Sequence, residues 1–299
     1  MWLRNLTVFT SDTDFPWSAQ ELDGLLDQTR CPPIGQQVPS VDGFVAPLRD
    51  DSVMLYHAAG LFYCQYQETS RLLPAGVIKE ELDERVAAIE ASEGRRPGRK
   101  QKADLKDQIT FELMPKAFTR SRRINVLIDT ERKRILVDNA AANRVDQVIS
   151  TLRKATGSLP VKRLEASLAP TEAMTRWLRE PDQLPAGITL GDRCELKSVK
   201  EQGGGIKVTG MDLGLEQVLA HLDTGMIANR LNLCWRDLFE FDLDESLAIR
   251  RLKPLDLIRE QIDNIDEQDE VAELQARITL QGQALRELID QLTEQLGEA

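Results

Sequence analysis

Apolar and polar residues alternate along many short stretches of this chain, and a period of two is typical of strands that bury one face. Near the start, for example, Leu6 and Val8 are apolar while Thr7 between them is polar. Short connections join several of these stretches, which favours antiparallel hairpins. The expected strands cover residues 3–10, 53–57, 61–66, 124–129, 134–138, 159–164, 206–210, 226–235, 238–243 and 247–252.

Other stretches repeat their apolar residues every three or four positions, as one face of a helix requires. Ser18 and Glu21 have the spacing of a capping box, so a helix is expected from there to about residue 29. Two apolar stripes flank a loop rich in Gly, Pro and Arg at residues 94–100, and they predict a helical hairpin over residues 78–114. Further helices are expected over residues 143–156, 171–179 and 213–222.

The C-terminal stretch combines both periods. From Ala272 to Gln281 apolar and polar residues alternate strictly, so this stretch is expected to form a strand with one wet face. Gly282 marks the change to helical spacing, and a final helix is expected after it. The whole pattern predicts the α+β class, with mixed or antiparallel sheets, packed helices and a protruding helical hairpin. The 299 residues allow roughly two domains of about 150 residues each.

The chain shows no sign of a membrane segment. Its longest uncharged run, residues 52–67, spans 16 residues and includes several polar ones. A membrane-spanning helix needs ~20 apolar residues, and the first residues lack the apolar segment of a signal peptide. We therefore expect a cytoplasmic protein that does not bind membranes.

The net charge of −11 hides a strong asymmetry along the chain. Residues 95–163 carry 18 basic and 7 acidic residues, whereas residues 1–94 carry 6 and 15, residues 164–255 carry 11 and 15, and residues 256–299 carry 3 and 12. A basic segment inside an acidic protein indicates an anionic partner, which one surface could bind while the rest repels it. The candidates for contacts to nucleic-acid phosphates are Arg95, Arg96, Arg99, Lys100, Lys116, Arg120, Arg122 and Arg123. Because no zinc finger, recognition helix or RNA-binding motif accompanies them, any binding should have little sequence preference.

Little else in the sequence points to catalysis or to a metal. The four cysteines and two histidines lie far apart, so a zinc site is disfavoured, and no metal or cofactor is expected. The glycine cluster at residues 203–205 fits a tight turn better than a phosphate loop. Asp129 and Asp138 end the two strands of one expected hairpin, which leaves a Mg²⁺-dependent nuclease as an alternative. A second alternative is a protein-interaction module whose basic patch meets an acidic partner.

Several stretches resemble the bacterial RdgC family of recombination-associated proteins. The clearest is Leu113-Met-Pro-Lys-Ala-Phe-Thr-Arg120, and the others follow the family's order along nearly the entire chain. They are residues 2–6, 72–79, 128–130, 137–138, 152–160, 195–198 and 251–253. The main departure is the loop around residues 95–102, which has glycine and proline among its cations in place of a plainer lysine-rich run.

The resemblance implies a non-enzymatic homodimer that closes a ring around double-stranded DNA, restrains RecA-driven recombination and is associated with the nucleoid. It implies a horseshoe-shaped subunit with a central domain (residues 1–75 plus 124–165), a hairpin tip (76–123) and a base (166–299). In such a ring tips contact tips, so Phe118 is expected in or beside the dimer contact; the alternative is a core residue. Lys197, Lys200 and Lys207 complete the expected set of DNA-binding cations.

Overall fold

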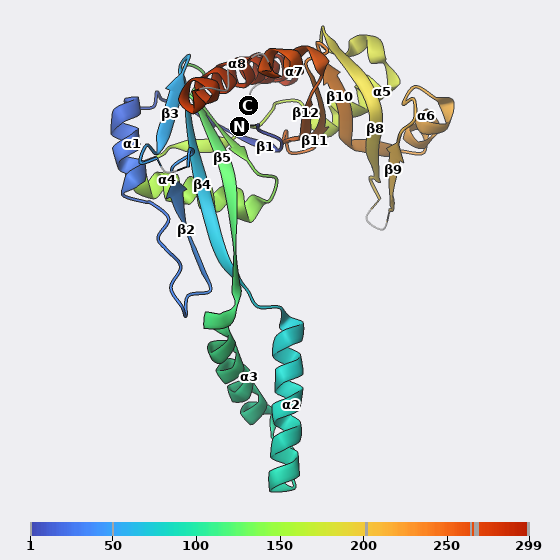
Figure 1. The fold of residues 1–299 in the computed structure, drawn as a ribbon. Helices are drawn as coiled ribbons and strands as arrows, with labels where there is room; N and C mark the ends of the chain where they lie inside the picture. Colours follow the sequence, from blue (N-terminus) through green and yellow to red (C-terminus); the bar gives the residue numbers. More distant parts are fainter. Residues whose placement is uncertain (1, 50, 201–202, 264, 266–268, 298–299) are drawn as a thin grey trace. The chain divides into compact units, whose positions relative to one another are not determined.

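The computed structural model describes residues 2–49, 51–200, 203–263, 265 and 269–297. Over these residues the chain is α+β, as predicted, with an antiparallel sheet of twelve strands. The chain divides into a larger unit, residues 1–28, 46–65 and 124–299, and a smaller unit, residues 29–45 and 66–123. Two long strands, β4 (Leu61–Leu72) and β5 (Phe118–Asp129), contribute residues to both units (Figure 1).

The other strands of the larger unit are β1 (Leu6–Ser11), β3 (Leu55–Ala58), β6 (Arg134–Asp138), β7 (Val161–Arg163), β8 (Ile188–Ser198), β9 (Gly205–Thr209), β10 (Met226–Trp235), β11 (Phe239–Asp244) and β12 (Ile249–Pro254). Within this unit they follow the order β4-β5-β6-β1-β12-β11-β10-β8-β9. The predicted hairpins β3–β4, β5–β6 and β11–β12 are confirmed. Leu6 lies opposite both Asp138 and Ile249, so the first strand of the chain occupies the middle of the sheet.

The helices of the larger unit are α1 (Ala19–Asp27), α4 (Ala142–Thr156), α5 (Pro170–Arg179), α6 (Glu216–Asp223), α7 (Asp256–Asp263) and α8 (Glu270–Leu296). The predicted capping box of α1 is confirmed. The Ser18 hydroxyl accepts from the Glu21 N–H at 3.2 Å, while the Glu21 carboxylate accepts from the Ser18 N–H at 2.8 Å. Two N–H groups at this helix start therefore have the partners that the sequence pattern predicts.

Helix α8 replaces the strand expected over residues 272–281 and continues through Gly282. The strand prediction is wrong because the buried residues Leu274, Ile278 and Gln281 are spaced four and three apart, as one helix face requires. The residues between them include Ala, Gln and Arg, which favour helices. Asp269 accepts hydrogen bonds from the first N–H groups and so caps the helix start.

Gly282 has a packing role within α8. A Cβ atom at this position would approach Leu61 Cδ1 to 2.3 Å. Glycine therefore lets α8 pack closely against the larger-unit part of β4, which offsets its low helix propensity. The sequence change at Gly282 thus marks a close contact rather than the boundary between two elements.

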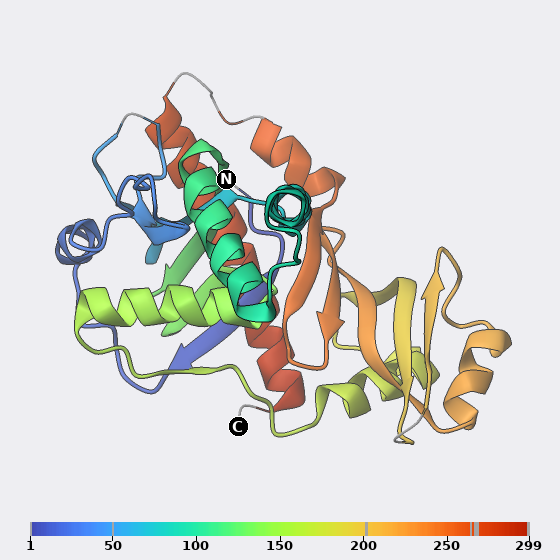
Figure 2. The ribbon, with the colours of Figure 1, turned by 90° about the horizontal axis from the view of Figure 1, so that it is seen from below.

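The strands β8 to β12 form a continuous sheet (Figure 2). Its two faces differ in chemistry. One face carries Trp235, Phe239 and Phe241, all fully buried in a core that also holds Trp177 of α5 and the apolar side of α8. Because side chains alternate along a strand, the residues between these aromatic positions lie on the other face. There they are polar or charged, as Glu240 is, and they form the charged sheet face described below.

The smaller unit contains β2 (Ser40–Val45), residues 66–72 of β4, residues 118–123 of β5, and the predicted helical hairpin. Its helices, α2 (Ala75–Glu93) and α3 (Arg99–Leu113), lie side by side (Figures 1 and 2). Apolar packing between them is thin: none of the described residues of α2 is buried, and in α3 only Ile109 is. Arg85 of α2 links the two helices through Glu112 of α3 at 2.5 Å, and it also pairs with Glu81 of its own helix at 3.0 Å.

Candidate nucleic-acid interface

The part of β5 that belongs to the smaller unit, residues 118–123, carries three arginines within four residues. Arg120 and Arg123 are exposed and Arg122 is half-buried, and exposed Lys116 precedes the strand. Among the described residues, no carboxylate forms an ion pair with Lys116, Arg120 or Arg122. Unpaired cations on a strand can approach an external phosphate without first losing an internal partner.

Contacts with β4 orient this cationic strand. Thr69 Oγ1 lies 2.8 Å from Ser121 Oγ, and Arg123 Nε donates to Gln67 Oε1 at 3.3 Å. These four side chains form a polar row on one face of the strand pair. Because successive side chains alternate between faces, Arg120 and Arg122 lie on the opposite face of β5. The strand therefore presents cations on both faces.

The hairpin loop and the start of α3 hold the other predicted cations of the smaller unit. Arg95 and Arg96 pair with Glu93 at 3.3 Å and Glu90 at 2.8 Å, but both arginines are highly exposed, and such pairs contribute little to stability. Arg99 and Lys100 form the first two positions of α3, whose first turn has no acidic residue and whose cap makes no side-chain hydrogen bond. A helix N-terminus already carries partial positive charge, so these cations are unfavourable for the helix and favourable toward an anion.

The three predicted lysines of the C-terminal region belong to the larger unit and have a different environment. Lys197 forms an ion pair with Glu245, and Lys207 Nζ lies 3.1 Å from Glu195 Oε1. Lys200 is exposed just after the end of β8. The structure therefore divides the predicted cations into eight in the smaller unit and these three in the larger unit.

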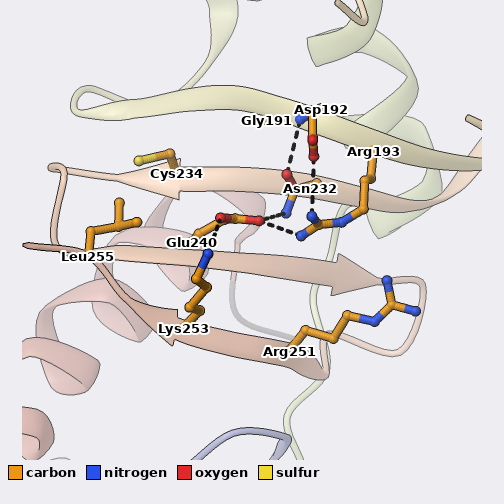
Figure 3. A pocket seen from close by; sticks show the side chains of 9 residues that line it. All are labelled: Gly191, Asp192, Arg193, Asn232, Cys234, Glu240, Arg251, Lys253 and Leu255. Carbon is orange, nitrogen blue, oxygen red and sulfur yellow. Dashed lines mark hydrogen bonds and ion pairs between the residues drawn. The ribbon is translucent and has the colours of Figure 1, made fainter. Parts of the chain in front are cut away.

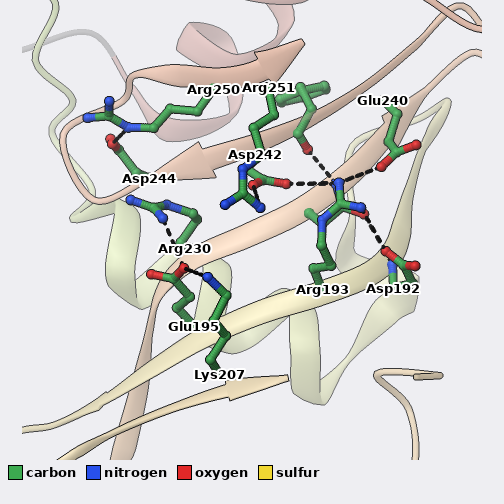
Figure 4. Close-up of polar contacts among 12 residues, drawn as sticks. Asp192, Arg193, Glu195, Lys207, Arg230, Glu240, Asp242, Asp244, Arg250 and Arg251 are labelled. Atoms are coloured by element: carbon green, nitrogen blue, oxygen red, sulfur yellow. Dashed lines mark hydrogen bonds and ion pairs between the residues drawn. The ribbon is translucent and has the colours of Figure 1, made fainter. Parts of the chain in front are cut away.

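Four further cations, which the sequence patterns did not single out, share a sheet face with Lys197 and Lys207. They are Arg193 of β8, Arg230 of β10, and Arg251 and Lys253 of β12. Together with Lys197, Lys207 and the carboxylates Asp192, Glu195, Glu240, Asp242 and Glu245, they form what we call the charged sheet face. Figure 4 shows the part of it around Arg193, Glu195 and Asp242. The signal that could have found part of this set is the alternation of charged with apolar residues over positions 193–197, the later part of β8.

Carboxylates on the charged sheet face are shared between cations from different strands. Glu195 Oε1 lies 3.0 Å from Arg230 Nη1 and 3.1 Å from Lys207 Nζ, so it bridges β10 and β9. Burial acts to raise the pKa of Glu195, but the Lys207 hydrogen bond and the Arg230 charge outweigh it and hold the pKa below its ordinary value. Glu195 is therefore a carboxylate anion at neutral pH.

A shallow hollow of about 710 Å³ lies on the same sheet face (Figure 3). Arg193, Asn232, Glu240, Arg251 and Lys253 are among the residues that line it. The buried Asn232 amide donates to Asp242 Oδ1 at 2.9 Å and its carbonyl accepts from the Asp192 N–H at 3.1 Å, which ties β10 to both neighbours. Hydrogen-bonded polar groups around Asn232 therefore form the base of the hollow.

The two carboxylates considered for a nuclease do not form a metal site. In the β5–β6 hairpin Asp129 pairs with Arg134. Asp138 instead accepts a hydrogen bond from Asn125 at 2.9 Å, and Asn125 precedes Asp129 by four residues on β5. Four residues of strand span roughly 13 Å. Asp129 is buried and bound by Arg286 at 2.7 Å, and the two aspartates lie at opposite ends of the paired strands.

Phe118 lies outside the core. Its side chain is 84% exposed at the first position of β5, so the alternative of a core residue is wrong for the described chain. Phe111 of α3 is also largely exposed, at 63%.

Neither a metal cluster nor a membrane span is found in the part of the chain that the structure describes. No group of three or more His, Cys, Asp or Glu side chains there could hold a metal ion. No helix formed by the same residues is both long and apolar enough to cross a bilayer.

Comparison with known proteins gives one family. The family model described as "Putative exonuclease, RdgC" matches residues 1–299. The chain is similar to proteins named recombination-associated protein RdgC from three bacteria. Identity is 33% to that of Proteus mirabilis over 99% of this chain and 98% of the relative, 33% to that of Pseudomonas aeruginosa (99% and 97%), and 34% to that of Halorhodospira halophila (99% and 98%).

Proposed function

The chain belongs to the RdgC family of recombination-associated proteins, and on that premise we propose that it binds double-stranded DNA with little sequence preference and restrains RecA-dependent recombination. Membership of this family fits a role in recombination. Occupation of duplex DNA by this protein would withhold that DNA from the recombinase. The protein would then act at the nucleoid and would need no cofactor.

The unpaired cations of the smaller unit carry this proposal. Lys116, Arg120 and Arg122 have no ion-pair partner among the described residues, and Arg99 and Lys100 crowd the positive end of α3. Each of these groups gains a counter-charge when a phosphate approaches. Phosphates are the same in every sequence, so contacts of this kind give affinity without specificity. Lys197, Lys200 and Lys207 belong to the proposed DNA contacts as well.

We further propose a homodimer that closes a ring around the duplex. The exposed Phe118 supports this, because burial of an 84% exposed phenylalanine in a subunit contact removes its apolar surface from water. A closed ring also makes a modest local attraction sufficient, since the DNA cannot leave sideways. In this arrangement Phe118 lies in or beside the contact between the two hairpin regions.

The proposed protein binds DNA without cleaving it. The structure supports this at Asp129 and Asp138, whose carboxylates are already bound by Arg286 and by the Arg4 and Asn5 N–H groups. The family label of an exonuclease makes a direct test necessary. End-labelled linear duplex incubated with the protein and Mg²⁺ should keep its length, and release of nucleotides would contradict the proposal.

A salt titration on unrelated duplexes tests the binding itself. With at least three unpaired cations on phosphates, the logarithm of the association constant should fall with the logarithm of salt at a slope of about −3 or steeper. The slope and affinity should be the same for duplexes of different sequence. If the protein binds no duplex even at low salt, the basic segment serves instead to contact an acidic protein partner.

A further inference from the structure

The cations of the charged sheet face differ from Arg120 and Arg122 of β5 in one respect: all six are already paired with a carboxylate of the same face. Arg193 contacts Glu240 at 2.5 Å and Asp242 at 3.3 Å. Arg251 contacts Asp242 at 3.3 Å and Lys253 contacts Glu240 at 3.8 Å. Lys197, Lys207 and Arg230 are paired with Glu245 or Glu195, as described above.

The strand register makes this pairing a property of the fold rather than of flexible side chains. Glu195 of β8 lies directly between Arg230 of β10 and Lys207 of β9 in the antiparallel register. Glu240 of β11 lies opposite Lys253 of β12. Side chains directly opposite each other on neighbouring strands are within contact distance, and opposite charges there attract. The carboxylates are thus held beside the cations whether or not DNA is present.

From this arrangement we infer that Glu195 and Glu240 lower the DNA affinity of the charged sheet face by neutralising cations that would otherwise bind phosphate. The inference rests on the proposed DNA binding. It holds that the affinity for DNA depends on two carboxylates, which lower it, as well as on the cations, which raise it. A phosphate that approaches Lys207 meets the negative charge of Glu195 about 3 Å from the ammonium group. Its attraction to the lysine is largely offset by repulsion from that carboxylate.

The exposed fractions indicate which cations a phosphate could reach once a carboxylate is neutralised. The side chains of Lys207 and Lys253 are 55% and 57% exposed, whereas Glu195 and Glu240 are only 25% and 22% exposed. The lysines therefore face outward and the glutamates lie beneath them. Replacement of a glutamate by glutamine keeps the size and an acceptor oxygen of the side chain, and it leaves the lysine above it without a counter-charge.

The test is a gain of affinity. Glu195→Gln should bind duplex DNA about fivefold more tightly at 0.15 M salt and steepen the salt slope by about one unit, the effect of one added phosphate contact. The control is Glu287→Gln on α8, which changes the total charge by the same amount but removes the partner of Arg236, at 2.5 Å, outside the charged sheet face. It should change affinity less than twofold.

A double substitution identifies the cation responsible. Lys207→Gln alone should lower affinity less than Arg120→Ala does, because Glu195 already offsets most of that lysine's charge, whereas Lys207→Gln added to Glu195→Gln should remove most of the gain. If Glu195→Gln fails to fold, Glu240→Gln gives the same test through Lys253. Equal affinity and slope for Glu195→Gln and Glu287→Gln would overturn the inference, and so would weaker binding by Glu195→Gln. Failure of the unaltered chain to bind duplex would overturn the proposed function, and this inference with it.

Discussion

The side-chain amide of Gln281, on helix α8, pairs with the backbone of Leu3 much as a neighbouring strand would. The Leu3 N–H donates to Gln281 Oε1 at 3.1 Å, and Gln281 Nε2 donates to the Leu3 carbonyl at 3.1 Å. Gln281 is 1% exposed and Leu3 is fully buried. Since buried backbone groups need partners, this one side chain holds the N-terminal segment against the C-terminal helix.

Replacement of Gln281 by leucine should therefore be costly. Two buried backbone groups of Leu3 would lose their partners, and each such loss costs about 1–3 kcal/mol. We expect the free energy of unfolding of Gln281→Leu to fall by roughly 2–4 kcal/mol in urea titrations. The control is Gln283→Leu, two residues further along α8 and exposed, which should change it by less than about 0.5 kcal/mol. Equal stability of the two variants would contradict this account.

Gln281 also shows why part of the fold could not be predicted. The hairpins, the α1 capping box and the helical hairpin follow from local patterns, and all are confirmed. The alternation over residues 272–281 placed Gln281 on a wet strand face, but its burial depends on Leu3, 278 residues away. Strand β8 was missed for a related reason: its Gly191, Asp192 and Arg193 do not alternate, and the pairing with β10 fixes the strand.

The candidate interface was predictable to a similar extent. Charge density along the chain was enough to find the cations of residues 95–123. It could not separate them into paired and unpaired groups, because a pair such as Arg193 and Glu240 joins residues 47 positions apart. The register of β8, β10 and β11 decides that pairing, and local sequence does not reveal a register.

Loss of one unpaired arginine should weaken DNA binding uniformly. We expect Arg120→Ala to lower affinity for all duplex sequences by a similar factor and to flatten the salt slope by about one unit. Arg259→Ala on α7 is the control, because Arg259 is an exposed arginine of the larger unit beside Asp256 at 3.6 Å. Filter binding or fluorescence anisotropy at several salt concentrations measures both quantities. A loss confined to one sequence would argue against phosphate contacts.

Phe118→Ser separates assembly from folding. An 84% exposed side chain contributes little to the stability of a single chain, so the substitution should leave the thermal unfolding of the monomer nearly unchanged. If Phe118 lies in the proposed subunit contact, sedimentation should show a weaker dimer. Leu257→Ser on α7, where the leucine is 54% exposed, serves as the matched control and should leave the dimer intact. A Phe118→Ser dimer as tight as the unaltered one would place the contact elsewhere.

A closed ring should be retained better on circular DNA than on linear DNA. Circular and linear duplexes of equal length have the same phosphate charge density, so simple electrostatic binding predicts equal retention on both. A ring can slide off a free end but must open to leave a circle. We expect the protein to remain on circular duplex after a moderate salt challenge and to leave linear duplex, and blocked ends should restore retention. Equal loss from both forms would favour an open clamp.

Acid should destabilise the protein through Asp244. Burial acts to raise the pKa of Asp244, but hydrogen bonds from Ser246 and Arg250 outweigh it and hold the pKa below its ordinary value. Such a carboxyl contributes stability that is complete above its unfolded pKa of about 3.9 and is lost as pH falls through its folded pKa. Asp244→Asn should therefore be less stable by about 1–3 kcal/mol at pH 7 and show a shallower decline below about pH 4. Urea titrations between pH 3 and 7 measure this, and an unchanged pH profile would rule out the role of Asp244.

The central position of β1 has a consequence for synthesis of the chain on the ribosome. Leu6 needs Ile249 of β12 beside it, and Leu3 needs Gln281, 278 residues later. At about 5–20 residues per second, Leu3 waits roughly 14–56 s for Gln281. During that interval the apolar surface that β12 and α8 will cover stays exposed on the nascent chain, where it favours aggregation. The nascent chain should therefore need chaperones until the last fifty residues, which include most of β12 and all of α8, have been synthesised.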